Sequence, residues 1–241
     1  MLDGRLGNDT LNGFTGSDTL IGGFGNDTYL FSLATPGETD RVEESFGQGS
    51  DTLSFSANTT GITLNLSDTA VQLVHTDRSL LLSSGSTVEN VLGGSGNDVI
   101  FGNSAANELS GNSGNDLLVG LAGNDTLNGG PGFDVLVGGR NQDILQGSIG
   151  EELLISGFTK NLSGIDDELA FLLNVQSLWA APAAFADRVQ SLTSILGSGT
   201  TVRNDSAVDT LTSNADGSLD WLFAALTDGV TKDVADILSL L

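Results

Sequence analysis

The chain has 241 residues, with 33 Gly, 8 Lys and Arg, 31 Asp and Glu, and a formal net charge of −23. So acidic a chain repels phosphate, which argues against nucleic-acid binding through a basic surface. The absence of cysteine excludes thiol catalysis, disulfides and cysteine-based zinc sites. The unbalanced charge indicates either disorder or a missing counterion.

Composition divides the chain near Lys160. Residues 1–160 hold 28 glycines and residues 161–241 hold only 5. No stretch approaches the ~18 apolar residues of a membrane span. The first residues lack the apolar core of a secretory signal, so export would need a different signal.

A nonapeptide repeat of the form G-G-x-G-x-D-x-U-x, with U apolar, occurs in ten units. The first position is always Gly, and the fourth is Gly except at Ala105 and Asn141. The sixth position is Asp in eight units, Asn107 in one and Glu152 in another. The eighth position is apolar in every unit, at Leu11, Leu20, Tyr29, Ile100, Leu109, Leu118, Leu127, Leu136, Leu145 and Leu154.

Each unit predicts a tight turn followed by a very short strand. Glycine permits positive φ in the turn, and the x-U-x segment sends one apolar side chain inward. If two units make one coil, strands stack in parallel every 18 residues and the carboxylates stack along two edges. Stacked carboxylates repel one another unless a cation lies between them. Oxygen ligands without His or Cys favour Ca²⁺ over zinc or copper.

These units resemble the repeats-in-toxin (RTX) nonapeptides of secreted bacterial proteins. The resemblance implies a mainly β fold, a parallel β-roll in which Ca²⁺ is shared by turns two units apart. The implied carboxylate pairs are Asp9 with Asp27, Asp98 with Asp116, Asp116 with Asp134, and Asp125 with Asp143. About four to six Ca²⁺ ions are expected. The metal-binding turns would comprise Gly4, Gly7, Asp9, Gly13, Gly16, Asp18, Gly22, Gly25, Asp27, Gly93, Gly96, Asp98, Gly102, Asn107, Gly111, Gly114, Asp116, Gly120, Gly123, Asp125, Gly129, Gly132, Asp134, Gly138, Asp143 and Glu152.

Two of these positions depart from the pattern. Asn107 keeps an oxygen but loses the charge opposite Asp125, and Glu152 is one methylene longer than Asp opposite Asp134. A single Gly-Asn-Asp segment is also simply a good turn sequence. Ten copies in phase favour the metal-binding interpretation.

Residues 32–92 interrupt the repeat, because Asp27 and Asp98 are 71 residues apart, which is not a multiple of nine. Alternating segments such as 52–55, 62–66 and 71–74 nevertheless predict strands that continue the roll. From Ser50 onward this passage is similar to the non-catalytic C-terminal domain of serralysin-type metalloproteases. The protease motif His-Glu-x-x-His is absent, and the sole histidine, His75, is expected to be structural.

After Ser156 the pattern changes toward helical periodicity. Residues 163–166 resemble a capping box, and the following apolar positions predict one helix ending at Pro182 and a second ending at Gly197. We expect a helical hairpin that caps the open end of the roll, with a partner-binding helix pair as the alternative. Residues 207–211 and 217–223 resemble degenerate repeat strands.

The sequence thus predicts four segments: repeats at 1–31, a β-rich interruption at 32–92, repeats at 93–155, and a helical cap with a tail at 156–241. The predicted function is a calcium-binding β-roll module of a secreted bacterial protein, folding on Ca²⁺ after type I export. The acidic then apolar C-terminus, residues 233–241, resembles a type I secretion signal. Alternatives are a non-catalytic tail of a larger secreted enzyme, since Met1 lies inside a repeat, or an adhesive or surface-layer module. No catalytic constellation is recognised.

Overall fold

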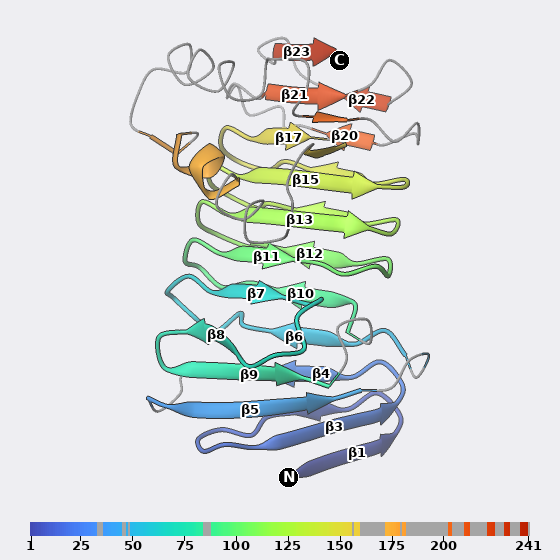
Figure 1. Cartoon of the computed structure of the whole chain (residues 1–241), viewed down its shortest axis with the longest axis vertical. Helices are drawn as coiled ribbons and strands as arrows, with labels where there is room; N and C mark the ends of the chain where they lie inside the picture. Colours follow the sequence, from blue (N-terminus) through green and yellow to red (C-terminus); the bar gives the residue numbers. More distant parts are fainter. Residues whose placement is uncertain are drawn as a thin grey trace.

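Three largely parallel β-sheets dominate the computed structural model (Figure 1). The structure describes residues 1–32, 36–44, 47, 49–83, 88–155, 157–159, 172–178, 180–181, 202–203, 210–212, 221–224, 229–231 and 237–240. We refer to the sheets as A, B and C. Within the described ranges, the one helix, at residues 172–178, is too short to cross a membrane.

The strands of each sheet stack along the long axis of the molecule. Sheet A contains β1 (Leu2–Leu6), β3 (Thr19–Phe24), β5 (Glu38–Glu43), β9 (Arg78–Leu82) and β8 (Gln72–His75). Sheet B contains β2 (Thr10–Leu11), β4 (Thr28–Leu30), β6 (Thr52–Ser54), β10 (Asn90–Leu92), β12 (Glu108–Ser110), β14 (Thr126–Asn128), β16 (Ile144–Gln146), β20 (Thr210–Thr212) and β22 (Gly229–Thr231). Sheet C contains β7 (Thr63–Asn65), β11 (Val99–Phe101), β13 (Leu117–Ala122), β15 (Val135–Arg140), β17 (Leu153–Ile155), β21 (Trp221–Ala224) and β23 (Ile237–Leu240). A separate antiparallel pair joins β18 (Phe158–Thr159) to β19 (Val202–Arg203).

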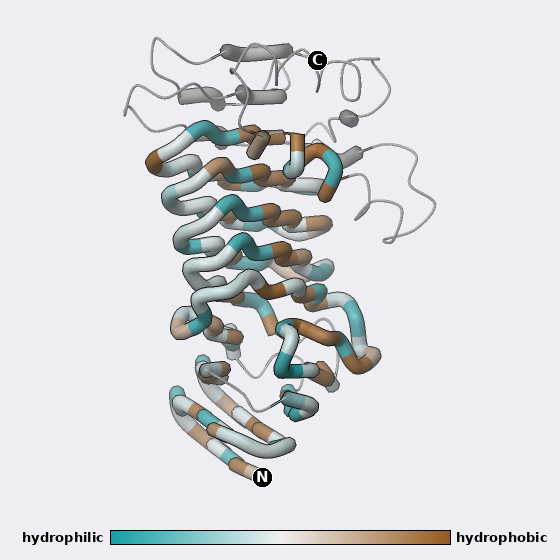
Figure 2. The backbone as a smooth tube through the Cα atoms, turned by 90° about the vertical axis from the view of Figure 1, so that its left-hand side faces the viewer, coloured by the Kyte–Doolittle hydropathy of each residue, from teal (hydrophilic) through white to brown (hydrophobic). Residues whose placement is uncertain are grey.

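Successive repeat units alternate between the two walls of the roll. Ile100 in sheet C lies opposite Leu118, and Leu109 in sheet B lies opposite Leu127. Both pairs are 18 residues apart, so two nonapeptides make one coil. Figure 2 shows this winding as a tube whose polar and apolar segments recur from coil to coil. The predicted parallel β-roll is confirmed.

The core is a ladder of the eighth residues of the repeat. All ten are buried, with at most 3% exposed, and they form one cluster between sheet B on one side and sheets A and C on the other. Tyr29 is the largest of them and is fully buried. One inward side chain per unit is therefore enough to fill the space between the walls, because neighbouring coils bury it from above and below.

The interruption continues the roll. Strand β5 extends sheet A beside β3, and β6 lies between β4 and β10, so that Leu53 is flanked by Tyr29 and Val91. Strand β7 begins sheet C next to β11. The added residues form the β8–β9 hairpin, whose second strand pairs in parallel with β5. The strands expected between residues 50 and 74 are present, with small shifts at their ends.

The described part of the first expected helix, residues 172–178, lies against a side wall of the roll. Its Leu172 and Val175 pack on the outer face of sheet C, in a cluster with Val119 and Val137. Gln176 Nε2 donates a hydrogen bond to the Asn115 carbonyl at 2.7 Å. The reason is that sheet C has apolar side chains on both faces, so its outer face also needs cover.

The remainder of the C-terminal region is described in part. The segments expected to be degenerate repeats contribute β20 and β21, which pair with β16 and β17 in the same parallel manner. Strand β23 then pairs with β21. The capping box at 163–166 and the second predicted helix, up to Gly197, lie outside the described residues.

Candidate metal-binding turns

The carboxylates of the repeats line the two edges where the chain passes from one wall to the other. We call the residues that immediately precede or begin the sheet B strands the first ladder: Asp9, Asp27, Asp51, Glu89, Asn107, Asp125 and Asp143. Those that precede or lie at the start of strands in sheets A and C form the second ladder: Asp18, Asp40, Asp98, Asp116, Asp134 and Glu152. Strand alternation between the walls thus divides one sequence series into two columns.

Backbone amides link neighbouring carboxylates within each ladder. The amide of Asp98 donates to Asp116 Oδ1 at 2.7 Å, and that of Asp116 to Asp134 Oδ1 at 2.9 Å. The same bond joins the other two pairs implied by the RTX resemblance, Asp9 with Asp27 at 2.7 Å and Asp125 with Asp143 at 2.9 Å. The structure therefore brings all four implied pairs together.

The second carboxylate oxygen has a different environment. The Oδ2 atoms of five ladder residues are buried and accept no hydrogen bond: Asp9, Asp27, Asp116, Asp125 and Asp134. A buried charged oxygen without a partner is costly, so natural structures rarely retain one without an ion or a water.

The first glycine of each unit keeps a space open beside this oxygen. A Cβ placed on Gly4 would lie 2.7 Å from both Asp9 Oδ2 and the carbonyl oxygen of Gly22 in the next coil. At Gly111 the corresponding atoms are Asp116 Oδ2 and the carbonyl of Gly129, and at Gly120 they are Asp125 Oδ2 and the carbonyl of Gly138. A carboxylate and a carbonyl from successive coils thus converge where any side chain would intrude. An all-oxygen donor set of this kind fits Ca²⁺.

Burial penalises the charged form of these carboxylates. It raises the pKa of Asp116 to about 8 and those of Asp125 and Asp134 to about 7, although the backbone amides partly oppose the shift. Burial also raises the pKa of Asp98. Burial thus disfavours the charged form of these groups, and a cation beside them would favour it.

The glycine at the fourth position of the unit provides the turn itself. Gly7, Gly16, Gly25, Gly114 and Gly123 have φ between +108° and +134°, a region that other residues avoid. Asn141 takes the fourth position of its unit at φ +77°, which asparagine tolerates better than most residues.

The two departures from the pattern differ in the structure. Asn107 Oδ1 accepts from the Asn103 amide at 2.8 Å, and its Nδ2 donates to the Glu89 carbonyl at 2.9 Å. Its side chain is thus satisfied by the protein. Glu152 is fully buried, and its Oε2 lies 2.8 Å from a Cβ placed on Gly147, as the Asp oxygens do at their own first glycines.

Sequence reasoning missed the ladder residues of the interruption. The amide of Asp27 donates to Asp51 Oδ1 at 2.8 Å, and that of Asp51 to Glu89 Oε2 at 2.9 Å. On the other edge, the Asp18 amide donates to Asp40 Oδ1 at 3.0 Å. One signal was present, since Asp51-Thr52-Leu53 repeats the Asp125-Thr126-Leu127 pattern.

A basic side chain also enters the second ladder. Arg78 is buried, its Nη1 pairs with Asp40, and its Nη2 lies 3.7 Å from Glu38 Oε2. Its guanidinium stacks over the Phe31 ring, 5.5 Å from the ring centre. Burial lowers the pKa of Arg78, and the charge of Glu38 opposes that shift. Here the chain itself supplies the cation.

The single histidine lies in the interruption. His75, at the end of β8, contacts the Thr60 hydroxyl through Nε2, and its Nδ1 lies 4.0 Å from Asp77. These contacts agree with the structural role expected for it.

Comparison with known protein families matches the RTX calcium-binding nonapeptide repeat in four copies, over residues 1–29, 84–118, 92–127 and 119–151. No curated protein matches the chain. The similarity of the middle segment to serralysins is not confirmed. The matched repeat is a calcium-binding structural unit, typical of secreted bacterial proteins, and no catalytic family is matched. The chain therefore carries RTX calcium-binding nonapeptide repeats within a parallel β-roll.

Proposed function

We propose that this chain is a calcium-dependent folding module of a secreted bacterial protein, and that its ladder carboxylates bind the ions. The observation that carries the proposal is the set of buried Oδ2 atoms without hydrogen bonds, each beside a first glycine. The proposed ligands are Asp9, Asp27, Asp98, Asp116, Asp125, Asp134 and Asp143, with carbonyls of the glycine turns. Glu152 is a further proposed ligand.

The ladder residues contribute in two ways. Each Oδ1 accepts a backbone amide from the preceding coil, which fixes the rotamer of the side chain and the register of the turn. The Oδ2 atoms of Asp9, Asp116 and Asp125 are then left beside a first glycine that a carbonyl of the following coil also approaches. Bound Ca²⁺ supplies two positive charges and accepts these hard oxygen donors. The same residues therefore hold the coils together only when their charge is balanced.

This arrangement couples binding to folding. The unfolded chain does not hold these oxygens together, so the free energy of binding becomes free energy of folding. Extracellular calcium modules typically bind with Kd of about 10⁻⁴ to 10⁻³ M, which matches millimolar calcium outside cells. At cytosolic calcium the repeats would stay unfolded, in a state suited to type I export through a signal in residues 233–241. Secretion of RTX proteins in general supports this location.

Far-UV circular dichroism during a calcium titration, followed by excess EGTA, tests the coupling. The proposal predicts a coil-like spectrum without calcium, strand signal with a cooperative rise on titration, and full reversal by EGTA. Titration with Mg²⁺ at the same concentrations is the control and should give little strand signal. An unchanged strand spectrum and melting temperature with and without calcium would refute the coupling.

A further inference from the structure

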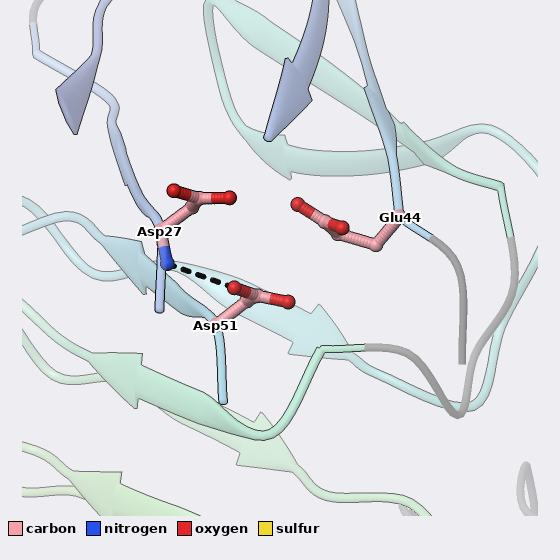
Figure 3. Close-up of side chains that lie close together, drawn as sticks. All are labelled: Asp27, Glu44 and Asp51. Carbon is pink, nitrogen blue, oxygen red and sulfur yellow. Dashed lines mark hydrogen bonds between the residues drawn. The ribbon is translucent and has the colours of Figure 1, made fainter. Parts of the chain in front are cut away.

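A cluster of three acidic side chains lies where the repeat stops, and two of its members come from the interruption. Asp27 ends the first repeat array, Glu44 follows β5, and Asp51 precedes β6 (Figure 3). One carboxylate oxygen from each lies within 4.8 Å of the others. All three residues are buried, with 1%, 7% and 1% of their surfaces exposed.

The contacts of Asp27 show that this cluster needs a ligand. Its Oδ1 accepts the Asp9 amide, whereas its Oδ2 is buried and accepts no hydrogen bond. A Cβ placed on Gly22 would collide with Asp27 Oδ2 and Glu44 Oε1, so both oxygens face one small space that only glycine leaves open. Figure 3 shows the carboxylates of Asp27 and Glu44 directed toward each other. Two like charges in this geometry repel strongly in a buried site.

The surroundings supply neutral hydrogen-bond donors to the cluster. Tyr29 donates its hydroxyl to Glu44, and the Asp27 amide donates to Asp51 Oδ1 at 2.8 Å. Burial and the charge of Glu44 raise the pKa of Tyr29, so the hydroxyl keeps its proton. Among the described residues, no basic side chain forms an ion pair with Asp27 or Asp51. These donors are neutral, so they orient the carboxylates without balancing the charge of Asp27 and Asp51.

The equivalent turn on the other edge shows what balances such a cluster. There the Asp18 amide donates to Asp40, as the Asp27 amide donates to Asp51. Glu38 lies beside Asp40 on that edge, in the place that Glu44 takes beside Asp27. Arg78 occupies that turn and pairs with Asp40. The two turns hold comparable sets of carboxylates, yet the fold brings an arginine to only one of them within the described chain.

We propose that Asp27, Glu44 and Asp51 form a calcium site outside the nonapeptide pattern, at the place that Arg78 takes on the opposite edge. Glu44 is the distinctive ligand, because it comes from the interruption and has no counterpart in the repeat. Its position is fixed from the end of β9, since the Glu44 amide donates at 3.1 Å to Oγ of Ser83, the residue that follows β9. The site would tie the interruption to the first repeat array. The inference rests on the proposed calcium binding and adds one ion to it.

Calcium stoichiometry of the full chain, measured by isothermal titration calorimetry and equilibrium dialysis, tests the site. Glu44→Gln and Asp51→Asn should each bind one fewer ion per chain than the unmodified protein. Glu43→Gln is the matched control, because it removes the same charge one residue away at a side chain 37% exposed and paired with Arg41. It should bind the full number.

Terbium luminescence gives a second readout that does not require a variant at the ligands. The chain has one tyrosine, Tyr29, and its hydroxyl contacts Glu44, so terbium bound there should be excited through tyrosine. The two tryptophans can also excite terbium, so the emission measured at a wavelength that excites tryptophan alone is subtracted from the total. Tyr29→Phe should abolish the tyrosine-excited emission while strand content in calcium is retained.

The outcomes separate this site from the general function. If the unmodified chain binds calcium but Glu44→Gln matches Glu43→Gln in stoichiometry, and Tyr29→Phe leaves terbium emission unchanged, the site is wrong and the proposed function stands. If the unmodified chain binds no calcium, both are wrong. Should Glu44→Gln fail to fold, tyrosine-excited emission from the unmodified chain that is displaced by calcium and lost in Tyr29→Phe supports the site. Its absence overturns the site.

Discussion

The turns of the second repeat array and the turn around Arg78 differ in what lies beside their buried carboxylates. In the array, Asp116 and Asp134 are linked by an amide hydrogen bond, and their Oδ2 atoms accept no hydrogen bond. At the junction with the interruption, the same bond links Asp18 of the first array to Asp40, but Arg78 pairs with Asp40. The backbone scheme is thus common to both regions, and the source of positive charge differs.

The difference shows what an RTX coil requires. One oxygen of each turn carboxylate accepts a backbone amide and fixes the register between coils. The other oxygen is buried, and its charge is costly unless a cation lies beside it. A basic side chain can meet that demand permanently, whereas a dissolved ion meets it only where its concentration suffices. We therefore expect calcium dependence in the turns where the described residues supply no arginine.

Removing the internal cation should have the largest effect. Arg78→Met would leave Asp40 and Glu38 buried without it, which we expect to lower the free energy of unfolding in calcium by about 3–5 kcal/mol. Arg41→Met, at an exposed arginine paired with Glu43, should cost less than about 1 kcal/mol. Urea unfolding of both variants checks this. Equal losses in the two would show that the buried pair is unimportant.

The effect of removing one ladder charge on stability should have opposite signs with and without calcium. Asp116→Asn keeps an oxygen for the Asp98 amide but removes a charge that burial disfavours. In a calcium titration, the folding midpoint of the variant should lie at a roughly tenfold higher calcium concentration, which corresponds to about 1.4 kcal/mol of binding free energy. In EGTA it should be as stable as the parent or more so. Asp3→Asn, at an exposed carboxylate, should change neither value. The same direction of change in both buffers would contradict the account.

Acidity should stabilise the calcium-free roll. Burial places the pKa of Asp116 at about 8 and those of Asp125 and Asp134 at about 7, against an ordinary value of 3.8. Between these values the folded state binds more protons than the unfolded state, so stability falls as pH rises, by up to about 1.4 kcal/mol per unit for each group. Strand signal in chelated buffer should therefore increase as pH is lowered from about 8 to about 5.

Calcium should reverse that dependence, since protons compete with the ion for the same oxygens. A calcium midpoint that rises as pH falls is expected from titrations at matched ionic strength. A strand signal in EGTA that is independent of pH would show that the ladder carboxylates are not buried as described.

The smallest effect concerns a turn residue that is unsuited to its backbone. Phe14 takes φ +61° in the first array and is 70% exposed, so its ring contributes little packing. Phe14→Gly should relieve about 1–2 kcal/mol of strain and lose about 0.5–1 kcal/mol to chain entropy. We expect a modest net rise in melting temperature in calcium. A fall would mean that the ring makes a stabilising contact.

The periodic part of the fold could be predicted from the sequence, because the repeat contains its own rule. The inward ladder from Leu11 to Leu154 and the 18-residue pairing of the Asp turns follow from a period of nine and two walls. The interruption could not be placed in the same way. Its ladder partners are separated by 22 and 24 residues, at Asp18 with Asp40 and Asp27 with Asp51, which no fixed period reveals.

Two other features depend on contacts far apart in the chain. Arg78 reaches Asp40 only because β9 pairs with β5 in parallel, a pairing that the hairpin sequence does not specify. The side-wall position of the helix had a sequence signal. Residues flanking the inward position are apolar in β11, β13, β15 and β17 of sheet C, as in Leu117 and Val119, but mostly polar in sheet B, as in Glu108 and Ser110.

Amide hydrogen exchange with and without calcium compares the two kinds of turn most directly. The amides of Asp98, Asp116 and Asp125 donate to carboxylates of the repeat turns, and that of Asp18 donates to Asp40 in the turn held by Arg78. We expect strong protection of all four amides in calcium. At a low calcium concentration, the amides of Asp98, Asp116 and Asp125 should lose protection before that of Asp18. Protection that is equal in calcium and in EGTA at Asp98, Asp116 and Asp125 would contradict the account.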